Sequence, residues 1–187
     1  FGLSPPGRTF ADEPHKTETK MIIQETSGGG ELPPKKPQTA VCIAVIDVGE
    51  SYGIAPDKSG RRMVPSMNPA HPDPKQKVRF MFESEEKMED GKPFPLTKQF
   101  NVTMSDQGYL KPFLDGWGVE LVKTGGGIDL EASCVGKCAM VNVTHDKDRT
   151  DPERIWANLS TAIPSDADLK PSGEFNKAEY LKLAQEK

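Results

Sequence analysis

One large aromatic side chain lies on the polar face of a predicted strand. Over residues 155–160, the apolar residues Ile155, Ala157 and Leu159 alternate with Trp156, Asn158 and a serine. Side chains point alternately to the two faces of a strand, so a core formed by the apolar residues turns Trp156 and Asn158 outward. An outward indole can stack on a nucleic-acid base or sugar. A loop or partner can equally cover it, and the pattern alone does not choose.

Positively charged residues gather in two predicted loops. The first, 49–76, is rich in glycine and proline, and the second, 146–154, joins two alternating runs. The candidate binding residues are Tyr52, Lys58, Arg61 and Arg62 in the first loop, and Lys147 and Arg149 in the second. Arginine beside an aromatic ring suits a phosphate with a stacked base, and a loop this long is usually functional or disordered. The loops therefore predict phosphate contacts, with a merely solvated basic loop as the alternative.

The cysteines and histidines form no recognisable catalytic or metal-binding motif. Cys134 and Cys138 stand four residues apart, but the sequence lacks the second ligand pair of a structural zinc site. His145 has no nucleophile or carboxylate motif beside it. We expect no catalysis, no metal and no cofactor, and a small hydrolase built around His145 is the weaker alternative.

Alternating runs predict the strands that position these residues. Residues 39–48 are apolar on both faces, which indicates a strand that is buried on both sides or curves around a barrel. Residues 77–83 and 97–105 alternate with a period of two and predict a hairpin. Their expected inward residues are Val78, Phe80, Phe82, Phe100, Val102 and Met104, and their outward residues are Lys77, Arg79, Met81, Gln99, Asn101 and Thr103. Residues 138–164 predict a second hairpin.

Two helices are predicted, one inside the domain and one near the end of the chain. Ser105 is placed to cap the first helix. Its apolar stripe is Leu110, Phe113, Leu114 and Trp117, with Pro112 in the first turn. The stripe predicts that Trp117 belongs to the core, and residues 118–134 are interpreted as a connection. Asn176, with Glu179 three residues later, is placed to cap the second helix, whose packing partner the sequence leaves open.

The 187 residues divide into one domain and two tails. Residues 1–38 predict a flexible, proline- and glycine-rich arm, 39–164 the domain, and 165–187 a tail with a short helix. No apolar run is long enough to cross a bilayer, and the first residues do not resemble a signal peptide. The three cysteines cannot form a paired framework, which favours reduced thiols in a cytoplasm. A net charge of −4 argues against indiscriminate binding to nucleic acid but allows local basic strips.

The order of the elements predicts a mainly β fold. A long curved strand, a hairpin, a helix and a second hairpin match the five-stranded oligonucleotide-binding (OB) barrel, which has a short helix between strands three and four. In that fold, the outer faces of strands two and three and the loops after strands one and four form the ligand groove. Here these elements carry Lys77, Arg79 and Asn101 together with the loop residues named above, and the fifth strand adds Trp156 and Asn158.

Four segments between about Thr39 and Pro164 carry a resemblance to known proteins, namely KVRFMFE, FNVTMSDQGYLKPFLDGWG, GKCAMVNVTH and RIWANLSTAIP. In these segments the sequence resembles a family of bacteriophage single-stranded DNA-binding proteins with the OB fold. The resemblance implies that the aromatic before Ala-Asn, Trp156, stacks on DNA. The chain departs from the family in the helix after the third strand, which is basic and ends in Trp-Arg-Gly in the family but ends in Trp117-Gly118 here.

Together these observations predict a non-enzymatic protein that binds single-stranded DNA with little sequence preference. The resemblance implies a role in phage DNA replication or recombination in the cytoplasm of an infected host cell, with replication or recombination proteins as partners and homo-oligomerisation left open. The alternative is a protein-interaction or virion-associated module on the same barrel that does not bind nucleic acid.

Overall fold

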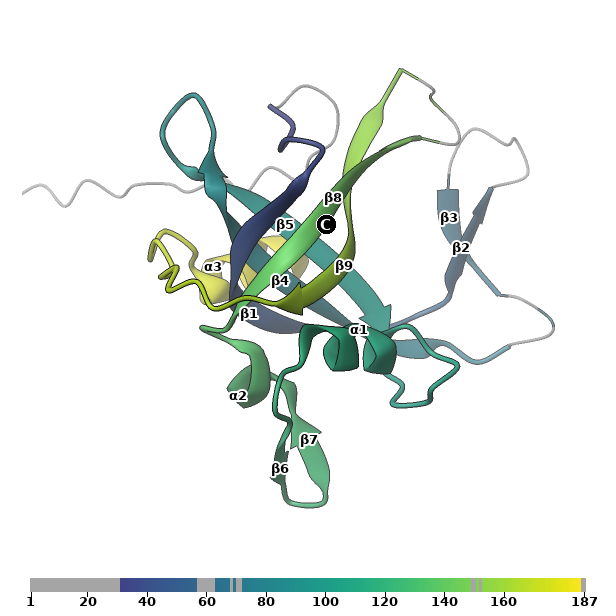
Figure 1. Cartoon of the computed structure of the whole chain (residues 1–187). Coiled ribbons are helices and arrows are strands. Elements are labelled where there is room, and N and C mark those ends of the chain that lie inside the picture. The colour runs from purple at the N-terminus through teal and green to yellow at the C-terminus, as the bar shows by residue number, and fades with distance from the viewer. Residues whose placement is uncertain are drawn as a thin grey trace, which may run out of the picture.

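A five-stranded antiparallel sheet forms the centre of the protein. The structure is a computed structural model that describes residues 31–56, 63–67, 69, 72–148, 151 and 153–185 (Figure 1). The sheet has the order β5-β4-β1-β8-β9. Its strands are β1 (Pro37–Ser51), β4 (Lys75–Lys87), β5 (Pro93–Asn101), β8 (Cys138–Lys147) and β9 (Ile155–Pro164). A separate two-stranded hairpin, β2 (Gly53–Pro56) and β3 (Met63–Ser66), follows β1.

The sheet is curved because its central strand is long and irregular. β1 pairs with β8 through Pro37–Val41 and with β4 from Ala40 onward. Register shifts between Cys42 and Ala44 and between Asp47 and Gly49 interrupt the β1–β4 ladder. Bulges of this kind bend a strand and increase its twist. The apolar run predicted for β1 is therefore confirmed as a strand buried along most of its length.

The inner face of the sheet packs against α1 (Leu110–Trp117). The predicted stripe is confirmed, since Leu110, Phe113, Leu114 and Trp117 are all buried. Rings from β4, β5 and α1 form one cluster, with centroids 4.8–6.1 Å apart. Trp117 is 2% exposed and its Nε1 donates to the Cys138 carbonyl oxygen at 2.8 Å. α1 thus holds the aromatic core at one end of the sheet.

The predicted start of this helix is wrong. α1 begins at Leu110, and Tyr109 occupies the N-cap position without a side-chain cap. Ser105 instead accepts a hydrogen bond from the Gln107 backbone N–H at 3.3 Å within a turn. β5 also ends at Asn101, so Val102 is outside the strand and 46% exposed rather than inward, while Met104 packs on the core. Ile155, another predicted core residue, is exposed at the start of β9.

Residues 118–134 are more structured than the predicted connection. They contain the hairpin β6 (Val122–Thr124) and β7 (Gly127–Asp129), followed by α2 (Leu130–Cys134). Gly125 and Gly126 have positive φ angles in the two-residue turn, a conformation that glycine adopts without steric cost. Asp129 caps α2 by accepting from the Ala132 N–H at 2.9 Å. The hairpin projects away from the sheet beyond α1 and α2 (Figure 1).

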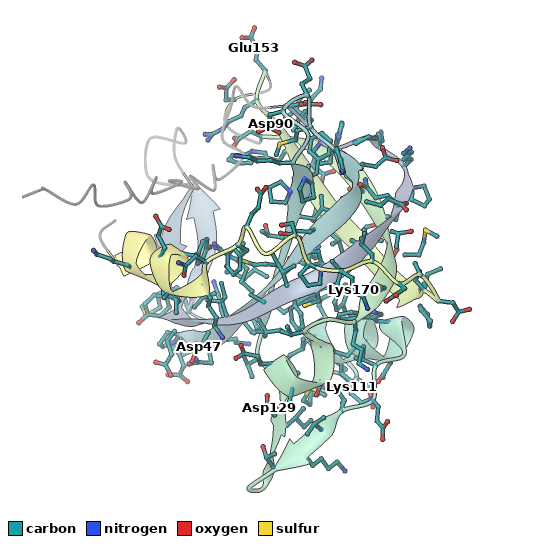
Figure 2. All side chains as sticks on the ribbon, turned by 90° about the vertical axis from the view of Figure 1, so that its left-hand side faces the viewer. Asp47, Asp90, Lys111, Asp129, Glu153 and Lys170 are labelled. Carbon is teal, nitrogen blue, oxygen red and sulfur yellow. The ribbon has the colours of Figure 1, made fainter. Side chains whose placement is uncertain are left out.

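The C-terminal segment, residues 165–185, lies across the outer face of β1 and β4. α3 (Lys177–Gln185) is present as predicted, and the Asn176 Oδ1 accepts from the Ala178 and Glu179 N–H groups. Figure 2 faces this side and shows the segment crossing the sheet, with Lys170 labelled on it. The apolar residues in contact are Phe175, Tyr180 and Leu181 from the segment and Ile43, Ala44, Ile46 and Met81 from the sheet. Met81, expected to face solvent, is consequently only 1% exposed.

The sheet does not close into the predicted barrel. β5 and β9 are its two edge strands, and no ladder joins them among the described residues. A side-chain hydrogen bond connects the two strands instead: the Lys98 Nζ on β5 donates to the Asn158 Oδ1 on β9 at 3.0 Å. The observed fold is therefore mainly β, with a curved open sheet and short helices. The arm predicted for 1–38 lies largely outside the described residues.

Candidate nucleic-acid interface

A cleft of about 780 Å³ lies where β5, α1 and β9 meet, and we call it the β5–β9 cleft. Its polar lining includes Lys77, Lys98, Gln99, Asn101, Asn158 and Ser160. Tyr109, which is 85% exposed, and Ile163, which is 51% exposed, supply apolar surface in the same cleft. None of the described residues that line it is acidic. The cleft therefore combines positive charge, amide groups and an exposed aromatic ring.

Lys98 occupies an unusual position for a charged residue. It is paired with the core residue Phe80 of β4, and directly opposite residues in an antiparallel pair share a face of the sheet. Lys98 thus begins on the inner face, and its side chain lies in the cleft between β5 and β9, which no ladder joins among the described residues. Burial lowers the pKa of Lys98, and the nearby Asp146 carboxylate opposes this effect. Its direct partner is the neutral Asn158 amide, which leaves the positive charge without an ion pair among the described residues.

The outer faces of β4 and β5 present two cross-strand polar pairs. Lys77 is opposite Asn101, and Arg79 is opposite Gln99. The Lys77 Nζ donates to the Tyr52 carbonyl oxygen at 3.0 Å, which ties this lysine to the end of β1. The predicted outward directions of Lys77 and Asn101 agree with their place in the cleft.

Arg79 is less available than the sequence indicates. Its Nε and Nη2 donate to the Gln99 Oε1 at 3.3 and 3.0 Å, and its Nη1 donates to the Tyr180 hydroxyl of α3. The C-terminal segment therefore engages this guanidinium and covers the adjacent part of the sheet. The surface available to a ligand is shifted from β1 and β4 toward the β5–β9 cleft.

Trp156 lies outside the core and in contact with its own hairpin. Its Nε1 donates to the Asp148 Oδ2 at 2.9 Å, and the Arg154 guanidinium carbon is 4.2 Å from the ring centroid. The ring is half-buried. Leu159, in contrast, is fully buried, as the alternation predicts. Loop residues thus hold the indole in one orientation on the polar side of β9.

Asn158 connects this ring to the β5–β9 cleft. Its Nδ2 donates to the Asp146 Oδ2 at 3.0 Å, while its Oδ1 accepts from Lys98. Asp146 is opposite Trp156 in the β8–β9 ladder, and Trp156 and Asn158 share a face because they are two residues apart. A polar strip therefore runs from Trp156 along β9 into the cleft.

The structure brings together only part of the predicted site. Lys77, Asn101 and Asn158 line the cleft, Trp156 adjoins it, and Tyr52 contacts Lys77 through its backbone. Lys147 ends β8 opposite Ile155. Lys58, Arg61, Arg62 and Arg149 lie outside the described residues.

Residues of this surface that sequence reasoning missed include Lys98, Tyr109 and Arg154. The signal for Lys98 was present, since a lysine between Leu96 and Phe100 interrupts an inward apolar pattern. Tyr109 immediately precedes a buried helix stripe, so pattern alone placed it with that helix. Arg154 resembled any other loop cation, because nothing in the sequence places a guanidinium over a particular ring.

Three other potentially reactive side chains among the described residues, His145, Cys134 and Cys42, are engaged in structure. The His145 Nε2 is 2.8 Å from the Pro33 carbonyl oxygen, a backbone contact rather than a catalytic pair. Burial raises the pKa of the Cys134 thiol to about 12 and raises that of Cys42 as well, and buried thiols of this kind are poor nucleophiles. Within the described ranges, no three His, Cys, Asp or Glu side chains gather as a metal site would require.

Comparisons of this chain with protein-family models, curated proteins and solved structures find no match. The resemblance to phage single-stranded DNA-binding proteins therefore stays a prediction from the sequence. In the described part of the chain, no helix has the length and apolar character needed to span a membrane.

Proposed function

We propose that this protein binds single-stranded DNA with little sequence preference, through the β5–β9 cleft and the adjoining Trp156. The observation that carries the proposal is the composition of that surface. Lysines, amide side chains and an exposed tyrosine line one cleft, no described acidic residue lines it, and a half-buried tryptophan lies beside it. Binding of single strands by proteins typically combines a cationic groove with aromatic rings on which bases stack.

The strand order supports an OB-type barrel as the scaffold of this proposal. In chain order, the five strands of the sheet are β1, β4, β5, β8 and β9. The first strand lies between the second and the fourth. The third strand is at one edge beside the second, and the fifth is at the other edge beside the fourth. The helix α1 follows the third of these strands. OB folds are five-stranded Greek-key barrels that are only partly closed. In our proposal the open β5–β9 seam is the place where this barrel remains open.

The chemistry of the surface favours single strands over duplex DNA. Aromatic faces stack on bases only when those bases are unpaired, whereas a duplex offers mainly phosphates. Lys77 and Lys98 supply few charges, and the protein as a whole carries a net charge of −4. Tight binding to a duplex would require a larger basic surface. On the sequence resemblance, we place this activity in phage DNA replication or recombination in the host cytoplasm.

A titration of the intact chain with DNA tests the proposal. A labelled oligo(dT) and a duplex of the same length are titrated at two salt concentrations, and binding is followed by fluorescence anisotropy. We expect salt-sensitive binding to the single strand and much weaker binding to the duplex. Equal affinity for both, or no binding to either, would contradict the proposed function.

A protein partner is the second candidate function, and the two edge strands favour it. On the side of the cleft, the edges of β5 and β9 have no strand partner in the described part of the chain, and Tyr109 and Ile163 are exposed there. An extended peptide can add to such an edge by strand pairing. This alternative predicts that oligo(dT) does not bind, whereas an immobilised copy of the protein retains a partner from phage-infected cells in high salt.

A further inference from the structure

Arg154 is held against Trp156 by the backbone of the β8–β9 hairpin. Its carbonyl oxygen accepts from the Asp148 N–H at 2.8 Å, and its own N–H donates to the Asp151 carbonyl oxygen at 3.0 Å. These bonds place the side chain at the start of β9. The guanidinium carbon then lies 4.2 Å from the centroid of the indole. Contacts of this kind, in which a cation lies over a tryptophan ring, are attractive.

The Arg154 guanidinium has an unused donor. Its Nε is buried and has no hydrogen-bond partner among the described residues. Leaving a buried donor of a charged group unpaired is unfavourable, and each such group in a native structure calls for an explanation. A ligand cannot reach this solvent-excluded Nε, so an incoming acceptor would bind the terminal Nη groups of the same guanidinium.

The geometry of a guanidinium indicates which acceptor fits. Its two terminal Nη groups form a planar fork whose outward N–H groups match the oxygens of a phosphate or carboxylate. The guanidinium lies over one face of the indole, so the opposite face is the aromatic surface that a base would use. A ligand that satisfies both groups carries an anionic oxygen pair next to a flat ring, and a nucleotide of single-stranded DNA has both.

We propose that Arg154 and Trp156 form one nucleotide-binding site, in which the Arg154 fork binds a phosphate and Trp156 stacks on a base. This inference rests on the proposed function and adds a binding residue and a division of roles to it. Asp148 is a positioning residue here, because its carboxylate accepts the indole N–H at 2.9 Å and fixes the orientation of the ring. The site adjoins the β5–β9 cleft through Asn158, so one strand can occupy both.

The experiment compares three proteins with the wild type. Arg154→Ala removes the fork and the charge, whereas Arg154→Lys keeps the charge but lacks the fork. Lys123→Ala is the matched control, because Lys123 is an exposed cation on the projecting β6–β7 hairpin. Each protein is checked for an unchanged thermal transition and then titrated with oligo(dT) over a series of salt concentrations. The same titrations use an oligonucleotide of equal length whose sugars lack bases.

We expect Arg154→Ala to weaken oligo(dT) binding about tenfold or more, as for other hydrogen bonds to charged groups. The slope of log affinity against log salt should fall by roughly 0.7, the value for one phosphate contact on a single strand. Arg154→Lys should restore the slope but not the affinity, and Lys123→Ala should change neither. The weakening by Arg154→Ala should persist on the abasic oligonucleotide, because the contact is to phosphate.

Two kinds of result separate this inference from the proposed function. If the wild type binds oligo(dT) but Arg154→Ala binds with the same affinity and slope, the Arg154 site is wrong and the proposed function stands. Full recovery of affinity by Arg154→Lys would likewise overturn the role of the planar fork. If Arg154→Ala does not fold, the folded Arg154→Lys variant decides between these outcomes. A wild type that does not bind oligo(dT) would refute both proposals together.

Discussion

The two tryptophans of this chain allow a decisive comparison, beginning with Trp156→Ala. In the free protein this change removes the hydrogen bond to Asp148 and the contact with the Arg154 guanidinium. An exposed cation–π contact contributes about 0.5–1 kcal/mol, and a typical hydrogen bond about 0.5–1.5 kcal/mol. Because Trp156 is outside the core, we expect no large cavity and a loss of roughly 1–2 kcal/mol of folding free energy.

The expected loss of binding is of a different kind. A stacked base contributes about 1–3 kcal/mol to single-strand binding. Since 1.4 kcal/mol corresponds to a factor of ten, Trp156→Ala should weaken oligo(dT) binding roughly 5- to 140-fold. Trp156→Phe keeps an aromatic face and should recover much of this affinity, whereas Trp156→Leu keeps only apolar bulk and should not.

Trp117→Ala is the matched control for stability. The Trp117 ring is 5.4 Å from Phe82 and 6.1 Å from Phe113, centroid to centroid, and its N–H satisfies the Cys138 carbonyl. Removing a buried ring of this size costs about 3–5 kcal/mol through the cavity left behind. We therefore expect Trp117→Ala to lower the unfolding free energy several times more than Trp156→Ala does.

Urea denaturation followed by circular dichroism measures stability, and anisotropy with labelled oligo(dT) measures binding. The reasoning is refuted if the Ala, Phe and Leu variants at position 156 fold normally and bind DNA equally well. It is also refuted if Trp156→Ala unfolds the protein as readily as Trp117→Ala does, because Trp156 would then be a core residue.

Two further predictions concern the cleft and the C-terminal segment. Burial lowers the pKa of Lys98, so the unfolded chain binds this proton more tightly and Lys98 disfavours folding at neutral pH. This penalty shrinks as pH rises above the lowered pKa, and it is gone once the unfolded side chain, with its ordinary pKa of 10.5, has also lost its proton. Lys98→Met should therefore raise the melting temperature at pH 7, and this advantage over the wild type should shrink toward pH 10. The variant should also bind oligo(dT) more weakly. A melting temperature below that of the wild type at pH 7 would contradict this reasoning. Truncation after Pro164 exposes Ala44, Ile46 and Met81. Burial of each large side chain contributes about 1.5–3 kcal/mol, and the entropy regained by the freed segment offsets part of this, so the truncation should lower the unfolding free energy by about 2–4 kcal/mol in urea denaturation. It should also increase binding of a hydrophobic dye. An unchanged unfolding free energy would show that the C-terminal segment does not stabilise the sheet.

Local periodicity was sufficient to predict much of the inner face of the fold. Val78, Phe80 and Phe82 are buried as their alternation predicts, and Trp117 is buried on the helix stripe. The Asn176 cap also followed from sequence, since a cap depends on residues two and three positions away. These predictions succeeded because each depends on the face or turn that neighbouring residues share.

Features that depend on distant parts of the chain were decided only by the tertiary structure. The alternation of β4 turns Met81 outward, but its burial depends on Phe175, Tyr180 and Leu181, about a hundred residues later. Lys98 has the period of a core residue, but it lines a cleft between β5 and β9, two strands that share no ladder among the described residues. Trp156 was assigned to the correct side of its strand, but the Arg154 guanidinium over its ring follows from how the hairpin loop folds back. A strand's sequence determines which side chains share a face, whereas the chain segments packed against that face determine whether it is core, cleft or binding surface.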